Sequence, residues 1–194
     1  MNPKYDIVEL IEGYQDWVQN YVNEGWSPFI ICFMLNQLRG SDSSVLGQMR
    51  REIERVYNRL PTRFHRVPNS RAGFKFLPRM ILFPDRPVFK REKKPIRDVS
   101  VNNGLHYTGI ALTPPFSRFD SRLDLHFVQN QQEYLSGKLA RVHVEQIIWD
   151  PQYVTDYAAK SVKQGSVSEE HIIILPRSTS EMKNASLSLA EETF

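Results

Sequence analysis

The chain has 194 residues, of which 41% are hydrophobic and 24% charged, a composition typical of one globular domain with a sizeable buried core. Its apolar runs are too short to span a bilayer and its N-terminus has no signal-peptide pattern, so we expect a cytoplasmic protein without a membrane partner. The single cysteine, Cys32, excludes an internal disulfide and a cysteine-based zinc site.

The net charge of +3 hides a strong asymmetry along the chain. Residues 50–97 contain 15 Lys and Arg against 4 Asp and Glu, an excess of +11, and the remaining residues therefore carry −8. A basic segment of this size indicates a polyanionic partner, with nucleic acid as the first candidate. The alternative interpretation is a set of solvated side chains on a helix and two strands.

Apolar periodicity and turn signals divide the chain into alternating helices and strands. In chain order we expect a helix over 5–23, a strand over 27–38, a helix over 42–60 capped by Asp42 or Ser43, an arginine-rich loop over 62–73, strands over 74–83 and 86–91 around a Pro84-Asp85 turn, strands over 96–101 and 105–112 around an Asn-Gly turn, a helix over 122–135, a strand over 139–149, a helix over 150–165 and a strand over 171–177. Hairpins among the strands favour an α+β fold, an antiparallel sheet covered by helices with an extra N-terminal helix. We expect residues 1–177 to form one domain and residues 178–194 to be a disordered tail.

The helix over 150–165 carries residues that can react. At 3.6 residues per turn, Tyr153, Tyr157 and Lys160 share one face of it. A phenol is a weak nucleophile at its ordinary pKa of about 10, so covalent chemistry requires a neighbouring cation such as Lys160. The alternative is an amphipathic helix with packed rings and solvated lysines.

A second candidate site lies on the strand over 105–112. Strand alternation puts His106 and Thr108 on the same face, and a hairpin would bring Asp98 beside His106. A histidine, a carboxylate and a neutral oxygen suit a hard divalent cation, Mg²⁺ or Mn²⁺. The alternative is a structural histidine without a metal.

Three stretches, in this order, resemble the motifs of the HUH endonucleases, the rolling-circle replication initiators and related nicking enzymes. They are IICFMLNQL, LHYTGIAL and YVTDYAAKSVK, an apolar strand, a histidine-bearing strand and a helix with a Tyr-x-x-Lys pattern. The resemblance covers roughly residues 27–165. It implies a split ferredoxin-like sheet and metal-dependent nicking and joining of single-stranded or hairpin DNA. The setting would be replication or mobilisation of a plasmid, phage or other mobile element, with a separate helicase as a further partner.

The resemblance also assigns roles to single residues. Tyr157 would attack the scissile phosphate to form a 5′-phosphotyrosine, with Tyr153 as a second nucleophile and Lys160 holding the phosphate or metal. His106 matches the first metal-ligand histidine, and Asp98 is the candidate acidic ligand.

Thr108 departs from the family pattern, which usually has a histidine at this place. A hydroxyl is a weaker ligand, so a DNA-binding relative that does not cleave is the alternative function. A protein-interaction domain with no nucleic-acid role is a third class. His126 is a candidate substitute ligand, with ordinary packing as its alternative.

Binding to DNA itself would depend on basic side chains that contact phosphates, with salt-sensitive affinity. The candidates are Arg50, Arg51, Arg55, Arg59, Arg63, Arg66, Arg71 and Lys163. Three phenylalanines interleaved with the arginines are candidates either for stacking on bases or for the core: Phe64, Phe74 and Phe76.

Overall fold

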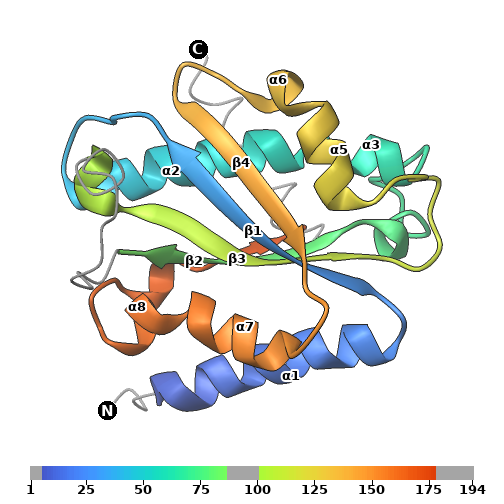
Figure 1. The fold of residues 1–194 in the computed structure, drawn as a ribbon, viewed down its shortest axis with the longest axis horizontal. Coiled ribbons are helices and arrows are strands. Elements are labelled where there is room, and N and C mark those ends of the chain that lie inside the picture. The colour runs from blue at the N-terminus through green and yellow to red at the C-terminus, as the bar shows by residue number, and fades with distance from the viewer. Residues whose placement is uncertain (1–5, 87–100, 178–194) are drawn as a thin grey trace.

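The computed structural model describes residues 6–86 and 101–177. Within them, five strands form one antiparallel sheet in the order β4-β1-β3-β2-β5, with helices on both faces (Figure 1). The strands are β1 (Ser27–Leu35), β2 (Arg79–Asp85), β3 (His106–Thr113), β4 (Leu139–Gln146) and β5 (Ile173–Leu175). The helices are α1 (Ile7–Asn23), α2 (Asp42–Tyr57), α3 (Pro61–Phe64), α5 (Leu123–Gln129), α6 (Gln131–Tyr134), α7 (Pro151–Ala158) and α8 (Lys160–Lys163). The expected α+β fold with an N-terminal helix is confirmed.

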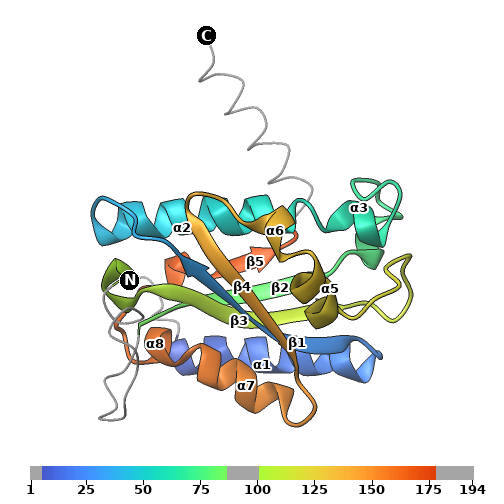
Figure 2. The same ribbon diagram turned by 45° about the horizontal axis from the view of Figure 1, so that its top comes forward.

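One face of the sheet is covered by α2, α5 and α6 (Figures 1 and 2). Strand alternation sends Phe29, Ile31 and Phe33 to this side, where they join Met49 and Ile53 of α2 in one buried cluster. Each fully buried side chain of this kind contributes roughly 1.5–3 kcal/mol relative to its exposed state. We call this side the α2 face; most of the hydrophobic core lies there.

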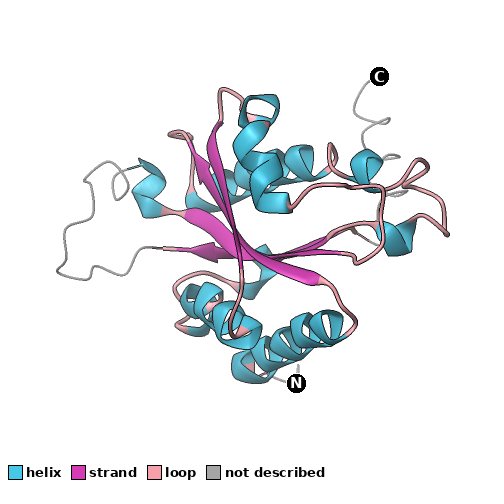
Figure 3. Ribbon diagram, turned by 45° about the vertical axis from the view of Figure 1, so that its right-hand side comes forward, coloured by secondary structure: helices cyan, strands magenta, loops and turns pink. Residues whose placement is uncertain are grey.

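The opposite face is covered by α1, α7 and α8, and we call it the α7 face (Figure 3). The alternate residues of the central strands point here, among them Phe83 and Ile110, which are buried together with Ile11, Val18 and Val154 of the helices. Because α1 also packs directly against α7, the N-terminal helix fixes the position of the helix that carries the tyrosines.

Strand β3 lies between β1 and β2, in the interior of the sheet. A Cβ atom at Gly109 would lie 2.0 Å from the carbonyl oxygen of Ile81, so only glycine allows β2 and β3 to approach this closely. The turn before β3 has positive φ angles of 52° at Asn102 and 55° at Asn103, which asparagine tolerates better than most residues. The Asn102 side chain accepts a hydrogen bond from the backbone N–H of Leu38, which ties this turn to the end of β1.

Two predictions about β2 were wrong. The strand predicted over 74–83 begins only at Arg79, because Phe74–Phe76 forms a 3₁₀ turn. Pro84 and Asp85, predicted as a turn, are the last residues of β2 and pair with Tyr107 and His106. The proline is tolerated at the end of the strand, where few ladder bonds remain to be made.

The helix predictions needed smaller corrections. Ser41, not Asp42 or Ser43, caps α2. The helix predicted over 122–135 is divided at Asn130, whose backbone φ of −114° is outside the helical range and whose side chain donates a second hydrogen bond to the carbonyl of His126. The helix predicted over 150–165 has a kink that separates α7 from α8. Most of the strands predicted over 86–91 and 96–101 lies outside the described residues. In residues 6–86 and 101–177, no helix is long and apolar enough to cross a membrane.

Candidate functional site

Residues far apart in the sequence meet where β2 ends, β3 begins and α7 joins α8. The antiparallel register places Asp85 directly opposite His106. Both side chains lie on the α7 face, because they are two residues from Phe83 and Thr108, which form the next pair on the same side. Helix α8 packs against β2, and this contact brings Lys160 and Ser161 to the same place.

The carboxylate of Asp85 is the centre of this group. Its side chain is only 5% exposed, and its Oδ2 lies 2.8 Å from Nζ of Lys160 and 3.5 Å from Nε2 of His106. Its Oδ1 accepts a 2.6 Å hydrogen bond from the hydroxyl of Ser161. A buried carboxylate requires such partners, since an unpaired buried charge costs roughly several kcal/mol. We call Asp85, His106, Tyr157, Lys160 and Ser161 the Asp85 cluster.

Lys160 connects the buried carboxylate with an accessible phenol. Its Nζ lies 4.4 Å from the centre of the Tyr157 ring. Burial disfavours the charged ammonium, but the hydrogen bond and charge of Asp85 outweigh it and raise the pKa of Lys160. Tyr157 is 49% exposed, so a held cation stands beside a phenol that solvent and substrate can reach. Tyr153, one turn earlier, is also exposed, which confirms the predicted shared face.

His106 has a defined orientation. Its Nδ1 lies 2.9 Å from the carbonyl oxygen of Gly104, a contact that assigns the ring proton to Nδ1. Nε2 is then the ring nitrogen that faces the carboxylate of Asp85, and it is the atom that would bind a metal ion.

Thr108 shares the face of His106, as predicted, but it is buried. Its partner in the register is Cys32 on β1. Burial raises the pKa of the Cys32 thiol, and a hydrogen bond from Thr108 lowers it in part. Asp98 lies outside the described residues. Among the residues that are described, no group of three or more His, Cys, Asp or Glu is arranged to hold a metal ion, so His106 and Asp85 are a pair of donors.

His126 lies elsewhere. It is buried on α5, on the α2 face, and its Nε2 is 2.7 Å from the hydroxyl of Tyr134. Burial lowers its pKa. Of the two interpretations of this residue, ordinary packing is the one that fits its position.

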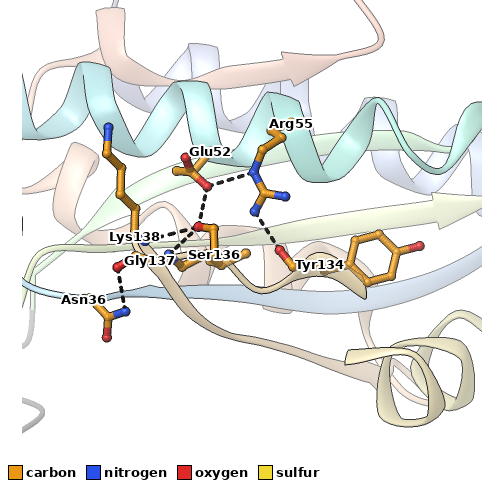
Figure 4. A network of polar contacts seen from close by, with 8 residues as sticks. Asn36, Glu52, Arg55, Tyr134, Ser136, Gly137 and Lys138 are labelled. Atoms are coloured by element: carbon orange, nitrogen blue, oxygen red, sulfur yellow. Dashed lines mark hydrogen bonds and ion pairs between the residues drawn. The ribbon is translucent and has the colours of Figure 1, made fainter. Parts of the chain in front are cut away.

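The structure does not bring the predicted DNA-binding arginines to the Asp85 cluster, since α2 and α3 lie across the sheet from α7 (Figure 1). Arg55 is held between Glu52 and the carbonyl of Tyr134 (Figure 4), and Arg50 donates to the carbonyl of Ile172. Arg63 pairs with Glu133. The remaining four are exposed: Arg51, Arg59, Arg66 and Arg71.

The other residues predicted to contact DNA also have partners within the protein. Lys163 is on the α7 face but pairs with Asp156 at 2.6 Å. Phe64 belongs to the core. Phe74 and Phe76 are partly buried, with Arg79 over the first ring and His65 stacked on the second. The core interpretation therefore fits Phe64, whereas Phe74 and Phe76 belong to neither core cluster and are covered by polar neighbours.

Sequence reasoning missed Asp85 and Ser161, and also an exposed row on β4. Arg141, His143 and Glu145 all point to the α7 face, and His143 is paired in register with Cys32. This row leaves the sheet open to solvent beside α7. A signal for the row was present, because these residues alternate with the inward-facing valines of the predicted strand.

Comparison with known proteins adds no further constraint. No protein-family model, no curated protein and no solved structure matches this chain. The function must therefore be argued from the arrangement of these residues.

Proposed function

We propose that this protein binds single-stranded DNA and nicks and rejoins it, with Tyr157 as the nucleophile. The observation that carries the proposal is the Asp85 cluster, in which an exposed phenol stands beside a lysine and a histidine that share one carboxylate. Transfer of a phosphodiester to a tyrosine requires a nucleophile, a fixed positive charge for the phosphate oxygens, and a group that binds protons or metal. The cluster contains one of each.

The proposed step is an exchange of one phosphodiester for another. The hydroxyl oxygen of Tyr157 attacks phosphorus, the bond from phosphorus to the 3′ oxygen breaks, and a 5′-phosphotyrosine forms. The phenol proton passes to solvent and the departing 3′ oxygen takes one up, so the products are the adduct and a free 3′-hydroxyl. Lys160, held by Asp85, stabilises the negative charge that develops. Rejoining is the reverse reaction and needs no other energy source.

Mg²⁺ or Mn²⁺ is part of this proposal. The donors that would hold the cation are Nε2 of His106, the ring nitrogen that faces Asp85, and the carboxylate of Asp85. The cation would act as a Lewis acid on the phosphate. Lys160 shares the same carboxylate, so ammonium and metal would together balance its charge.

A specific observation favours a second candidate, DNA binding without cleavage. Thr108, at the place where the resemblance expects a second histidine, is buried against Cys32, and a hydroxyl is a poor metal ligand. A protein that kept the exposed β4 row and had lost the metal would bind a strand and leave it intact.

The experiment uses a labelled single-stranded oligonucleotide library incubated with the protein and Mn²⁺. We expect a covalent adduct that survives denaturing electrophoresis, is lost in Tyr157→Phe and persists in Tyr153→Phe. The matched phenylalanine variants differ only in which hydroxyl is removed. An adduct that persists in Tyr157→Phe contradicts the assignment of the nucleophile, and salt-dependent binding without any adduct supports the second candidate.

A further variant separates the two candidates. Thr108→His combined with Cys32→Ala adds a metal donor beside His106 and makes room for it in the facing strand. If only this ligand limits cleavage, adduct formation rises in the double variant and Cys32→Ala alone has no effect. Without a gain in a folded double variant, a missing second histidine is not what limits the reaction.

A further inference from the structure

A pocket of about 330 Å³ opens beside the Asp85 cluster. It lies where β4 leads into α7, two elements that can be followed in Figure 1. Trp149, Tyr153 and Tyr157 line it, over an apolar floor that includes Ile30, and Glu145 and Gln146 stand at its polar edge. A volume at the lower end of the range for ligand sites, roughly 300–1,000 Å³, suits a single small planar group.

The aromatic side chains of this pocket are unusually open to solvent. Trp149 is 61% and Tyr153 57% exposed, and their ring centres are 5.2 Å apart in a tilted arrangement. Rings presented together in this way provide flat surfaces on which a nucleobase can stack. They contribute little to the core, so their exposure favours a role in contact with a ligand.

Tyr157 belongs both to this pocket and to the Asp85 cluster. If the hydroxyl of Tyr157 attacks a phosphate, the nucleoside next to that phosphate would therefore lie at the mouth of the pocket. We propose that the pocket binds one base of the DNA strand next to the scissile phosphate, an inference that rests on the proposed function. The base stacks against Trp149 and Tyr153, and the strand runs toward the cluster.

The polar edge of the pocket indicates which bases it accepts. The side chain of Glu145 is 73% exposed, and its carboxylate can only accept hydrogen bonds. It therefore suits a base that offers a donor, such as the exocyclic amine of cytosine. Thymine presents a carbonyl at the corresponding position and would face the carboxylate without a donor. The pocket therefore prefers cytosine, or adenine, to thymine.

Tryptophan fluorescence tests this inference without requiring cleavage. Of the three tryptophans, Trp26 is buried and Trp149 is the most exposed. We expect oligo-dC to quench the fluorescence of the intact protein, and Trp149→Phe to remove most of that response. Trp149→Ala should weaken strand binding at least ~5-fold, since a stacked base is lost. Phe116→Ala, which removes an exposed ring elsewhere, should leave binding unchanged.

The base preference is tested with a matched pair of pyrimidines. Oligo-dC should bind more tightly than oligo-dT, and Glu145→Gln should reduce the ratio of the two affinities toward one, because an amide can both donate and accept. Glu145→Gln also removes a negative charge, so the ratio, and not the absolute affinity, is the readout.

The outcomes separate the pocket from the proposed chemistry. Quenching through Trp149 without any covalent adduct supports the pocket and contradicts nicking. Strand binding or adduct formation with unchanged Trp149 fluorescence overturns the pocket and leaves the proposed function intact. Absence of any strand binding overturns both. Dimerisation that is lost in Trp149→Ala, with no response to DNA, would assign the pocket to a second copy of the chain and also overturn the inference.

Discussion

The two faces of the sheet differ in the side chains that they present to the helices. On the α2 face the strands present apolar side chains along their length, and even the buried His126 is satisfied by Tyr134. On the α7 face the apolar layer stops short of the end of β2 and the start of β3, where Asp85, His106 and Lys160 take its place. The comparison indicates that most of the stability comes from one face, while the Asp85 cluster lies at one end of the other.

The largest expected effect tests the α2 face. Met49→Ala removes a fully buried side chain from the main core and should lower the free energy of unfolding by about 2–5 kcal/mol. Urea denaturation measures the loss. Adduct formation by the folded fraction should be unchanged, and a parallel loss of cleavage at low temperature would show that the two faces are not independent.

A smaller loss of stability is expected from the α7 face, together with a loss of function. Asp85→Asn leaves Lys160 without its partner and should cost about 1–3 kcal/mol, less than a fully buried pair because Lys160 is partly exposed. Adduct formation should fall at least ~10-fold, since the positive charge is no longer held in place.

A double-mutant cycle apportions this effect. In combination with Lys160→Met, the Asp85→Asn cost should be reduced by a coupling energy of about 0.5–3 kcal/mol. Additive costs would mean that the ion pair adds nothing to stability.

The pH dependence of stability tests the buried histidine. Burial lowers the pKa of His126, so as pH falls through the unfolded value of about 6.5 the unfolded chain takes up a proton that the folded protein does not bind. The stabilising contribution is complete above the unfolded pKa of about 6.5 and is lost as pH falls through the folded value. His126→Gln, which can keep a bond to Tyr134, should flatten the pH dependence of the melting temperature. An identical slope in both proteins would contradict this assignment.

The smallest expected effect decides which face binds the strand. Arg141→Gln, on the exposed β4 row, should lower the slope of log affinity against log salt by about 0.7, the value for one phosphate contact with a single strand. Arg59→Gln, an exposed arginine on the α2 face, is the matched control and should leave the slope unchanged. The reverse result would return DNA binding to the basic segment on which the sequence places it.

Local patterns predicted much of the fold. Apolar periodicity located α1 and α2, a nearly continuous apolar run located β1, a turn signal located β3 and alternation located β4. The helical face of Tyr153, Tyr157 and Lys160 followed from spacing alone. Prediction failed at Pro84, which was interpreted by its usual preference for a turn but lies in β2 and pairs with β3. It also failed at Asn130, which the apolar pattern placed inside one helix but which separates α5 from α6.

The sequence by itself determined most of the elements, the face that each side chain occupies within its own element, and the position of the Tyr157 phenol beside a lysine. Only the tertiary structure decided which elements meet. The pairing of β2 with β3 selected Asp85 as the neighbour of His106, and the packing of α2 across the sheet separated the arginines from Tyr157. The physical reason is that periodicity records whether a residue faces the core, whereas strand register and helix placement depend on how distant apolar surfaces are buried together.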